Sequence, residues 1–302
     1  MLKKYLDPDQ TLMKTQGFKP NFVIKFLRWL SRLIIICLRL NGKSRWSNEF
    51  IQQLDPSITI SPKFFNDDKK VQPIWFRTGH GRLYWRAKHT FNLEKETNDW
   101  IKSFKQSDIF FDVGANVGLY SIMASKLMKI KTYAFEPDLM NARILYENII
   151  KNNVSNLVTI LPLALADYNY CADLYLKTVS YGDALHNLDS KNQNIDSDHE
   201  AKVSIPAFSI DSIISILSLD KPTKLKIDVD GIEIRILKGA KEALVTVDEI
   251  IVEWSRSKKD SSEILEYLEN LGFKLIWESN PHNTYIDTVN AFFKKENNEK
   301  RN

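Results

Sequence analysis

The chain has 302 residues, of which 43% are hydrophobic, 11% aromatic and 26% charged. This apolar content is sufficient for one large core and excludes a wholly disordered or fibrous protein. Ten Gly and ten Pro are too few for a low-complexity linker protein, and no internal repeat is visible. The two cysteines, Cys37 and Cys171, form no CxxC pair and show no zinc-site spacing, so we expect a reducing compartment.

Positive charge is concentrated at the N-terminus. Residues 1–46 carry ten Lys and Arg against two Asp, which leaves 32 Lys and Arg against 36 Asp and Glu for the rest of the chain. Between residues 22 and 40, apolar residues recur at helical spacing beside a stripe of cations, which predicts a basic amphipathic helix. Two interpretations stay open: its apolar face docks on this protein or a partner subunit, or the helix lies on an anionic membrane surface.

The chain shows no sign of a secretory signal or of a membrane span. Its longest uncharged apolar run, residues 33–38, is far shorter than the roughly 20 residues that cross a bilayer. We therefore expect a cytoplasmic protein, with peripheral membrane contact through residues 22–40 as the alternative. No nucleic-acid reader motif occurs, so nucleic acid is not an expected partner. The sequence leaves the oligomeric state open.

An N-terminal extension, residues 1–93, is expected before the main domain. Three prolines in residues 47–73 predict an irregular connection after the helix. Two aromatic runs flank the turn of residues 79–81, and this pattern predicts a β-hairpin over residues 74–86.

Residues 94–295 are predicted to form an α/β domain. After a helix over residues 94–104, buried strands alternate with helices, which is typical of a parallel sheet with right-handed crossovers. The last two strands have no helix between them and should pair antiparallel. An irregular, polar stretch, residues 178–201, lies between two short β-like pieces and is expected to be either a lid over an acceptor site or a disordered excursion. The expected strands are residues 109–113, 131–136, 158–165, 224–229, 249–255, 273–279 and 289–295.

A glycine turn, DVGANVG at residues 112–118, ends the first buried strand and opens a helix. Gly114 permits a sharp turn, and the helix N-terminus offers unpaired amides to an anion. Glu136 ends the next strand, where a carboxylate can accept hydrogen bonds from ribose hydroxyls. The DVGANVG motif does not match the GxGxxG pattern of dinucleotide-binding proteins, which disfavours a dinucleotide as the ligand. Since the carboxylate of Asp112 can form an ion pair with an ammonium group, we expect a ligand with a nucleoside at one end and an amino acid at the other.

DVGANVGLYSIMAS, AFEP, LKIDVDGIEIRILKGA and IIVEWS follow one another in an order that resembles the FkbM family of S-adenosylmethionine-dependent methyltransferases. The resemblance implies a Rossmann-like class I methyltransferase sheet, strand order 3-2-1-4-5-7-6, with S-adenosylmethionine as the cofactor. It implies that residues 164–167 border the adenine and that Glu136 holds the ribose. The residues implied around the methionine portion are Asp112, Gly114, Ala115, Asn116 and Gly118.

Asp228 is the expected catalytic residue, because ligands gather at the carboxyl ends of strands in open α/β sheets. It could remove the acceptor proton or hold a divalent cation that acidifies the hydroxyl, although no metal site is predicted. Asp230, Glu233 and Glu253 add carboxylates, or form only a turn and a helix start. His186 is another candidate base, and acceptor contacts are expected from Trp75, Tyr84, Trp85 and Arg86 unless these residues only pack the hairpin.

The family resemblance favours O-methylation of a sugar, a glycan or a lipid-linked hydroxyl, so a small-molecule or glycan acceptor is the expected partner. Two alternatives remain: a nicotinamide-dependent oxidoreductase on a related sheet, and a non-catalytic, membrane-associated binding module.

Overall fold

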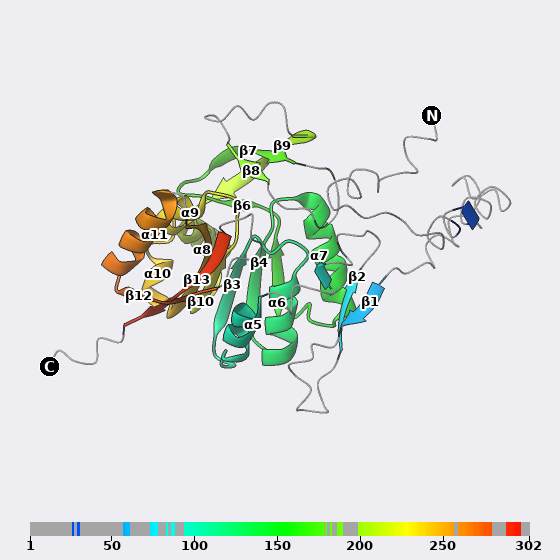
Figure 1. The fold of residues 1–302 in the computed structure, drawn as a ribbon, viewed down its shortest axis with the longest axis horizontal. Coiled ribbons are helices and arrows are strands. Elements are labelled where there is room, and N and C mark those ends of the chain that lie inside the picture. The colour runs from blue at the N-terminus through cyan, green and yellow to red at the C-terminus, as the bar shows by residue number, and fades with distance from the viewer. Residues whose placement is uncertain are drawn as a thin grey trace. The chain divides into compact units, whose positions relative to one another are not determined.

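Figure 1 shows the fold in a computed structural model of the chain. The structure describes residues 26, 29–30, 57–60, 73–77, 83, 86–87, 94–177, 179, 182, 186–189, 199–256, 259–279 and 288–296. The chain divides into two compact units, residues 1–56 and 57–302. The second unit contains both of the sheets that position the site.

Seven strands form the central sheet, in the order β12-β13-β11-β10-β3-β4-β5. Strand β13 runs antiparallel to both of its neighbours, whereas β11, β10, β3, β4 and β5 are parallel. Counted along the chain within this sheet, the order is 3-2-1-4-5-7-6, so the expected Rossmann-like class I methyltransferase sheet is confirmed. The strands are β3 Ile109–Val113, β4 Lys131–Phe135, β5 Val158–Leu161, β10 Lys224–Ile227, β11 Glu249–Ser255, β12 Phe273–Glu278 and β13 Thr288–Lys295.

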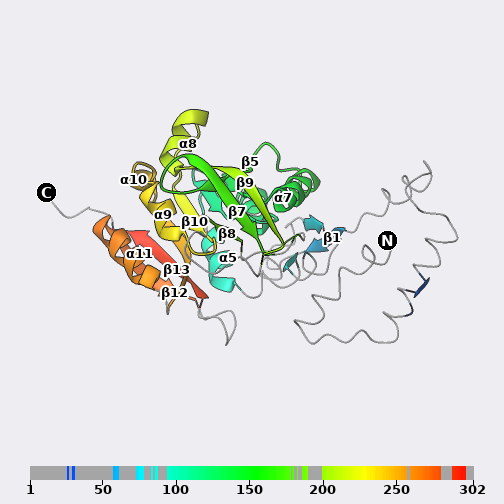
Figure 2. The same cartoon turned by 90° about the horizontal axis from the view of Figure 1, so that it is seen from above.

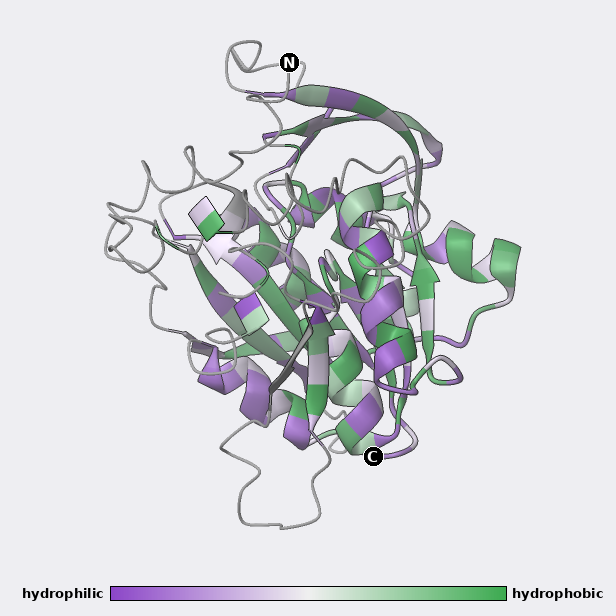
Figure 3. Cartoon of the chain, turned by 90° about the vertical axis from the view of Figure 1, so that its right-hand side faces the viewer, coloured by the Kyte–Doolittle hydropathy of each residue, from purple (hydrophilic) through white to green (hydrophobic). Residues whose placement is uncertain are grey.

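Helices cover both faces of this sheet because its strands are apolar on both sides. Phe110 of β3 packs in a cluster with residues of α5, α6 and α7, whereas its neighbour Phe111 packs in a cluster with residues of α8, α9, α10 and α11. In Figure 3 the central strands are largely green, and the outer helices mix green with purple. The helices are α5 Lys95–Lys102, α6 Leu119–Met123, α7 Leu139–Lys151, α8 Ile210–Leu217, α9 Glu233–Lys238, α10 Ala243–Thr246 and α11 Lys259–Asn270, and α6 continues into a π-helix, Ala124–Met128.

A second sheet of four strands lies over one end of the central strands (Figures 1 and 2). Its order is β6-β9-β7-β8, and it begins three residues after β5 ends. Part of the stretch expected to be irregular, residues 178–201, is therefore a strand, β8. The strands are β6 Ala164–Leu165, β7 Tyr170–Leu176, β8 Asn187–Leu188 and β9 Ala201–Phe208.

The expected hairpin over residues 74–86 is wrong. Strand β2, Ile74–Arg77, pairs antiparallel with β1, Ser57–Ile60, which lies in the stretch expected to be irregular. Leu83 and Ala87 are helical and buried, with 1% and 2% of their surface exposed. They stand four residues apart, so helical spacing of buried side chains, rather than strand alternation, governs this segment.

The first unit has three described residues, Phe26, Trp29 and Leu30, within the helix expected over residues 22–40. All three are helical and have exposed side chains. The other residues of that expected helix lie outside the described part of the chain. Among the helices that the structure describes, none combines the length and apolarity that a membrane span requires.

Candidate functional site

The glycine loop, residues 114–118, joins β3 to α6. Gly114 and Gly118 have φ angles of 80° and 86°, and Asn116 has 50°, a left-handed region that favours Gly and Asn. The N–H groups of Gly114 and Ala115 both donate to the carbonyl of Phe135 at 3.0 Å. The loop is therefore fastened to the end of β4.

Glu136, the residue after β4, holds the same loop from its side chain. Its Oε2 accepts from the N–H of Asn116 at 2.7 Å, and its Oε1 accepts from the N–H of Asp138 at 2.9 Å. Only 4% of the residue is exposed. Burial raises the pKa of Glu136 to about 7, although the two backbone N–H groups favour the carboxylate.

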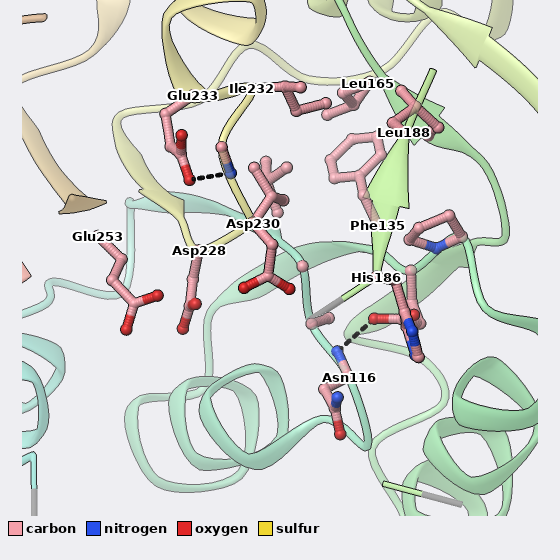
Figure 4. A pocket seen from close by; sticks show the side chains of 18 of the residues that line it. Asn116, Phe135, Leu165, His186, Leu188, Asp228, Asp230, Ile232, Glu233 and Glu253 are labelled. Carbon is pink, nitrogen blue, oxygen red and sulfur yellow. Dashed lines mark hydrogen bonds between the residues drawn. The ribbon is translucent and has the colours of Figure 1, made fainter. Parts of the chain in front are cut away.

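One cavity of about 690 Å³ opens beside the glycine loop. Four of the predicted cofactor residues lie in its wall: Gly114, Ala115, Asn116 and Glu136. Apolar side chains line the part next to β5 and the second sheet, and Phe135, Leu165 and Leu188 are seen there in Figure 4. The other apolar members of this part are Leu163, Ala164 and Leu174. The cavity thus has an apolar region adjoining Glu136.

Two of the predicted cofactor residues are absent from the cavity wall. Asp112 is 2% exposed, and its Oδ2 accepts from the hydroxyl of Ser121 on α6 at 2.5 Å. Burial raises its pKa, against the effects of Lys226 and Ser121. A Cβ built on Gly118 would lie 2.1 Å from Cδ1 of Leu145, so this glycine allows α7 to pack closely. Asp112 and Gly118 therefore contact α6 and α7 rather than the cavity.

Asp228 lies in the cavity wall just beyond β10, paired with a buried lysine. The ammonium of Lys226 donates to Asp228 Oδ2, and only 1% of Lys226 is exposed. Lys226 is in register with Asp112, and its Nζ lies 4.9 Å from the ring centroid of Tyr120. Burial, the largest single effect, would raise the pKa of Asp228, but the adjacent ammonium, the hydrogen bond with Glu253 and the charge of Arg86 together outweigh it and leave that pKa below its ordinary value. Asp228 is therefore ionised at neutral pH.

Glu253, at the end of β11, places its carboxyl group beside that of Asp228 (Figure 4), and the two share a hydrogen bond. Burial, together with the charge of Asp228, raises the pKa of Glu253 well above its ordinary value. The two neighbouring carboxyl groups are therefore shifted in opposite directions, with the pKa of Asp228 below its ordinary value and that of Glu253 well above it.

Two further carboxylates follow Asp228 in the wall. Asp230 is exposed, and Figure 4 shows it between Asp228 and His186. Glu233 is 6% exposed and accepts from the N–H of Gly231 at 3.1 Å, so it closes the turn before α9. Burial raises the pKa of Glu233 to about 8. Within the part of the chain that the structure describes, no three His, Cys, Asp or Glu side chains form a metal-binding group.

His186 lines the cavity away from Asp228 (Figure 4), and its ring is close enough to Glu136 to lower the pKa of that carboxyl group. Its Nε2 is 3.6 Å from Oδ2 of Asp138. The two candidate bases of the sequence analysis, His186 and Asp228, therefore lie apart in the cavity wall.

The sequence interpretation missed Lys226 and Glu94, of which Glu94 lines the cavity and accepts from the amide of Asn290 at 3.0 Å. The signal for Lys226 was present, because a lysine in a strand buried on both faces requires a charged partner. Arg86 also lines the cavity, and its Nε donates to the carbonyl of Gly182 at 2.7 Å. Trp75 is not among the residues that line the cavity. Its backbone N–H and carbonyl form hydrogen bonds with the side chain of Asn152, the residue that follows α7. Tyr84 and Trp85 lie outside the described residues.

Two curated proteins resemble this chain at low identity. It is 24% identical over 170 residues to "Hexuronic acid methyltransferase AglP" of Haloferax volcanii, covering 56% of this chain and 65% of that protein. It is 26% identical over 192 residues to "Methyltransferase 1" of Beauveria bassiana, covering 59% of this chain and 77% of that protein. The similarity to the archaeal enzyme thus spans less than two thirds of that enzyme's length.

Among solved structures, TrmK of M. capricolum, crystallised with S-adenosyl-homocysteine, is 12% identical, with a TM-score of 0.39 over 66% of this chain and 67% of that one. The family model described as "Methyltransferase FkbM domain" matches residues 112–275, more than half of the chain. The strand order of the central sheet agrees with this match. The chain therefore belongs to the FkbM methyltransferase domain family, and S-adenosylmethionine is its cofactor.

Proposed function

We propose that the protein transfers a methyl group from S-adenosylmethionine to a hydroxyl oxygen of a sugar, either free or within a glycan or a lipid-linked saccharide. The observation that carries this proposal is the Asp228–Glu253 pair, two adjacent carboxyl groups with pKa values shifted in opposite directions, in a cavity wall shared with the glycine loop. The archaeal relative, whose name states that it methylates hexuronic acid, supports a sugar acceptor.

The residues around the cavity fit the cofactor. The absence of a side chain at Gly114 lets the glycine loop lie directly against the backbone of Asp228, and Glu136 retains lone pairs that can accept from ribose hydroxyls. The apolar wall of Leu163, Ala164 and Leu165 suits the flat face of a purine. When bound, the cofactor supplies an electrophilic methyl group on a positively charged sulfur.

Asp228 is assigned to the acceptor. A hydroxyl oxygen must lose its proton as it forms the new bond to carbon, and an ionised carboxylate in hydrogen-bond contact can take it. The buried ammonium of Lys226 keeps Asp228 ionised, so the base is available at neutral pH. The raised pKa of Glu253 favours its protonated form, which can donate a hydrogen bond to the acceptor or to Asp228 and so orient either.

Two measurements test this function. Calorimetric titration of the purified full chain with S-adenosylmethionine should show binding, and Glu136→Ala should weaken it; absence of heat with the native protein would remove the proposal. Mass spectrometry of glycans and lipids from cells with and without the protein should reveal one saccharide species that differs by the mass of a methylene group. If the added group is found only on nitrogen or on a peptide, the acceptor class is wrong.

A further inference from the structure

His186 is a buried side chain whose hydrogen-bonding groups are unused. Its side chain is 10% exposed, and neither Nδ1 nor Nε2 has a hydrogen-bond partner although both atoms are buried. Leaving a buried polar group unpaired is costly, and such groups are rare in folded proteins. A ligand in the adjoining cavity would remove this cost.

The second sheet fixes the position of His186. The residue leads directly into β8, in which Asn187 pairs with Tyr175 and Leu188 pairs with Leu174 of β7. His186, Leu188 and Leu174 all line the cavity. His186 is thus the residue before a paired strand, and this pairing fixes the backbone position from which its imidazole extends.

Glu136 and His186 offer complementary groups to one part of a ligand. The His186 ring is close enough to Glu136 to lower the pKa of its carboxyl group. Each oxygen of Glu136 already accepts one backbone N–H, and a carboxylate can only accept. A hydroxyl that donates to Glu136 keeps lone pairs that require a donor, and a second hydroxyl beside it requires a second partner. A neutral imidazole has one donor and one acceptor, so it can serve either hydroxyl.

We propose that His186 is a further cofactor-binding residue, which hydrogen-bonds a ribose hydroxyl of the methyl donor beside Glu136. This assignment rests on the proposed function, since it requires S-adenosylmethionine in the cavity. It gives part of the second sheet a binding role that the sequence motifs of the central sheet do not contain.

The test is a thermodynamic cycle between one side chain and one ligand hydroxyl. Affinities of S-adenosylhomocysteine and of its 2′-deoxy and 3′-deoxy analogues are measured by calorimetry for the native chain, for His186→Ala and for His186→Gln. We expect His186→Ala to weaken S-adenosylhomocysteine about tenfold, the size of one lost hydrogen bond. We expect His186→Gln, which keeps an amide donor and acceptor, to recover part of that loss.

The coupling decides the assignment. If His186 bonds a ribose hydroxyl, removal of that hydroxyl costs the native chain about tenfold more than it costs His186→Ala, for at least one analogue. Losses that simply multiply for both analogues would overturn the assignment, because they indicate an indirect effect. If both variants lose their cooperative thermal transition, His186 is a structural residue and the assignment is likewise wrong. If the native chain binds no S-adenosylhomocysteine, it is the proposed function that fails.

Discussion

Gly114 packs directly against the backbone of Asp228. A Cβ built on Gly114 would lie 1.9 Å from the carbonyl oxygen of Asp228, and the N–H of Asp228 donates to the carbonyl of Val113 at 3.0 Å. The residue that opens the glycine loop and the proposed base are therefore held together by main-chain contact. This places the base at a fixed distance from the loop.

We predict that Gly114→Ala destabilises the protein by about 3 kcal/mol or more and abolishes cofactor binding. Two effects combine: the φ angle of 80° is unfavourable for Ala, and the new methyl group must displace a backbone carbonyl. Urea unfolding and calorimetric titration with S-adenosylhomocysteine measure the two consequences.

Gly272→Ala is the matched control, because Gly272 has almost the same φ, 81°, but no atom within 4 Å of a built Cβ. It should cost only the conformational part, about 1–2 kcal/mol, and leave cofactor binding unchanged. Equal losses of stability in the two variants would show that the contact with Asp228 is not important.

The central sheet was predictable because buried apolar strands and glycine-marked turns are local signals. Of the second sheet, only two short β-like pieces beside residues 178–201 were expected, at the places of β7 and β9. Their pairing into a sheet and α8 were not expected, since β7 and β9 are half-exposed strands in which burial alternates only in part. The hairpin error has a related cause. Aromatic runs around glycines suggested strand alternation, but burial at Leu83 and Ala87 follows a helix.

We predict that Asp228→Asn lowers turnover by about a hundredfold or more while the affinity for S-adenosylmethionine changes by less than about threefold. The amide preserves the shape of the side chain but cannot take the acceptor proton. Single-turnover assays with the acceptor found by mass spectrometry, alongside calorimetry, separate the two quantities. Full turnover in this variant would exclude Asp228 as the base.

The site was predictable only where its residues stand next to glycines or at strand ends. Glu136 and Asp228 were selected as candidates in this way, and the structure brings both into one cavity wall. Asp112 was expected in that wall by its place before Gly114, but strand alternation turns its side chain toward Ser121 of α6. The opposite pKa shifts of Asp228 and Glu253 depend on buried contacts between separate strands, which no local pattern contains.

We predict that S-adenosylhomocysteine binds more tightly as the pH rises from 6 to 8, by up to about tenfold. With the pKa of Glu136 raised to about 7, the carboxylate that we propose as the acceptor of hydrogen bonds from ribose hydroxyls is incompletely formed below that pH. In Glu136→Gln the corresponding rise should be absent. His186→Gln is measured in parallel and should keep the rise. A rise that persists in Glu136→Gln would exclude the Glu136 carboxyl group as its cause.

We predict that residues 1–46 promote sedimentation of the full chain with vesicles that contain anionic lipid. The excess of Lys and Arg in this segment attracts such a surface, and Phe26 and Trp29 expose 46% and 56% of their surface. Neutral vesicles and a chain without residues 1–46 are the controls. Equal sedimentation of the two chains with anionic vesicles would favour docking of the helix on protein.

We predict that Glu233→Gln removes part of the loss of stability that the native chain shows as the pH rises. Burial raises the pKa of Glu233 from 4.5 to about 8. A carboxyl group with a raised pKa contributes its full stability below pH 4.5, and this contribution falls as the pH rises through the folded value, because ionisation is easier in the unfolded chain.

The free energy of unfolding of Glu233→Gln relative to the native chain should therefore increase between pH 5 and 8, by about 3 kcal/mol. The glutamine carbonyl can still accept from the N–H of Gly231, so the turn before α9 is preserved at every pH. Urea unfolding at a series of pH values, without ligand, gives this difference directly. A difference that stays constant over the range would mean that Glu233 ionises in the folded protein as easily as in the unfolded chain.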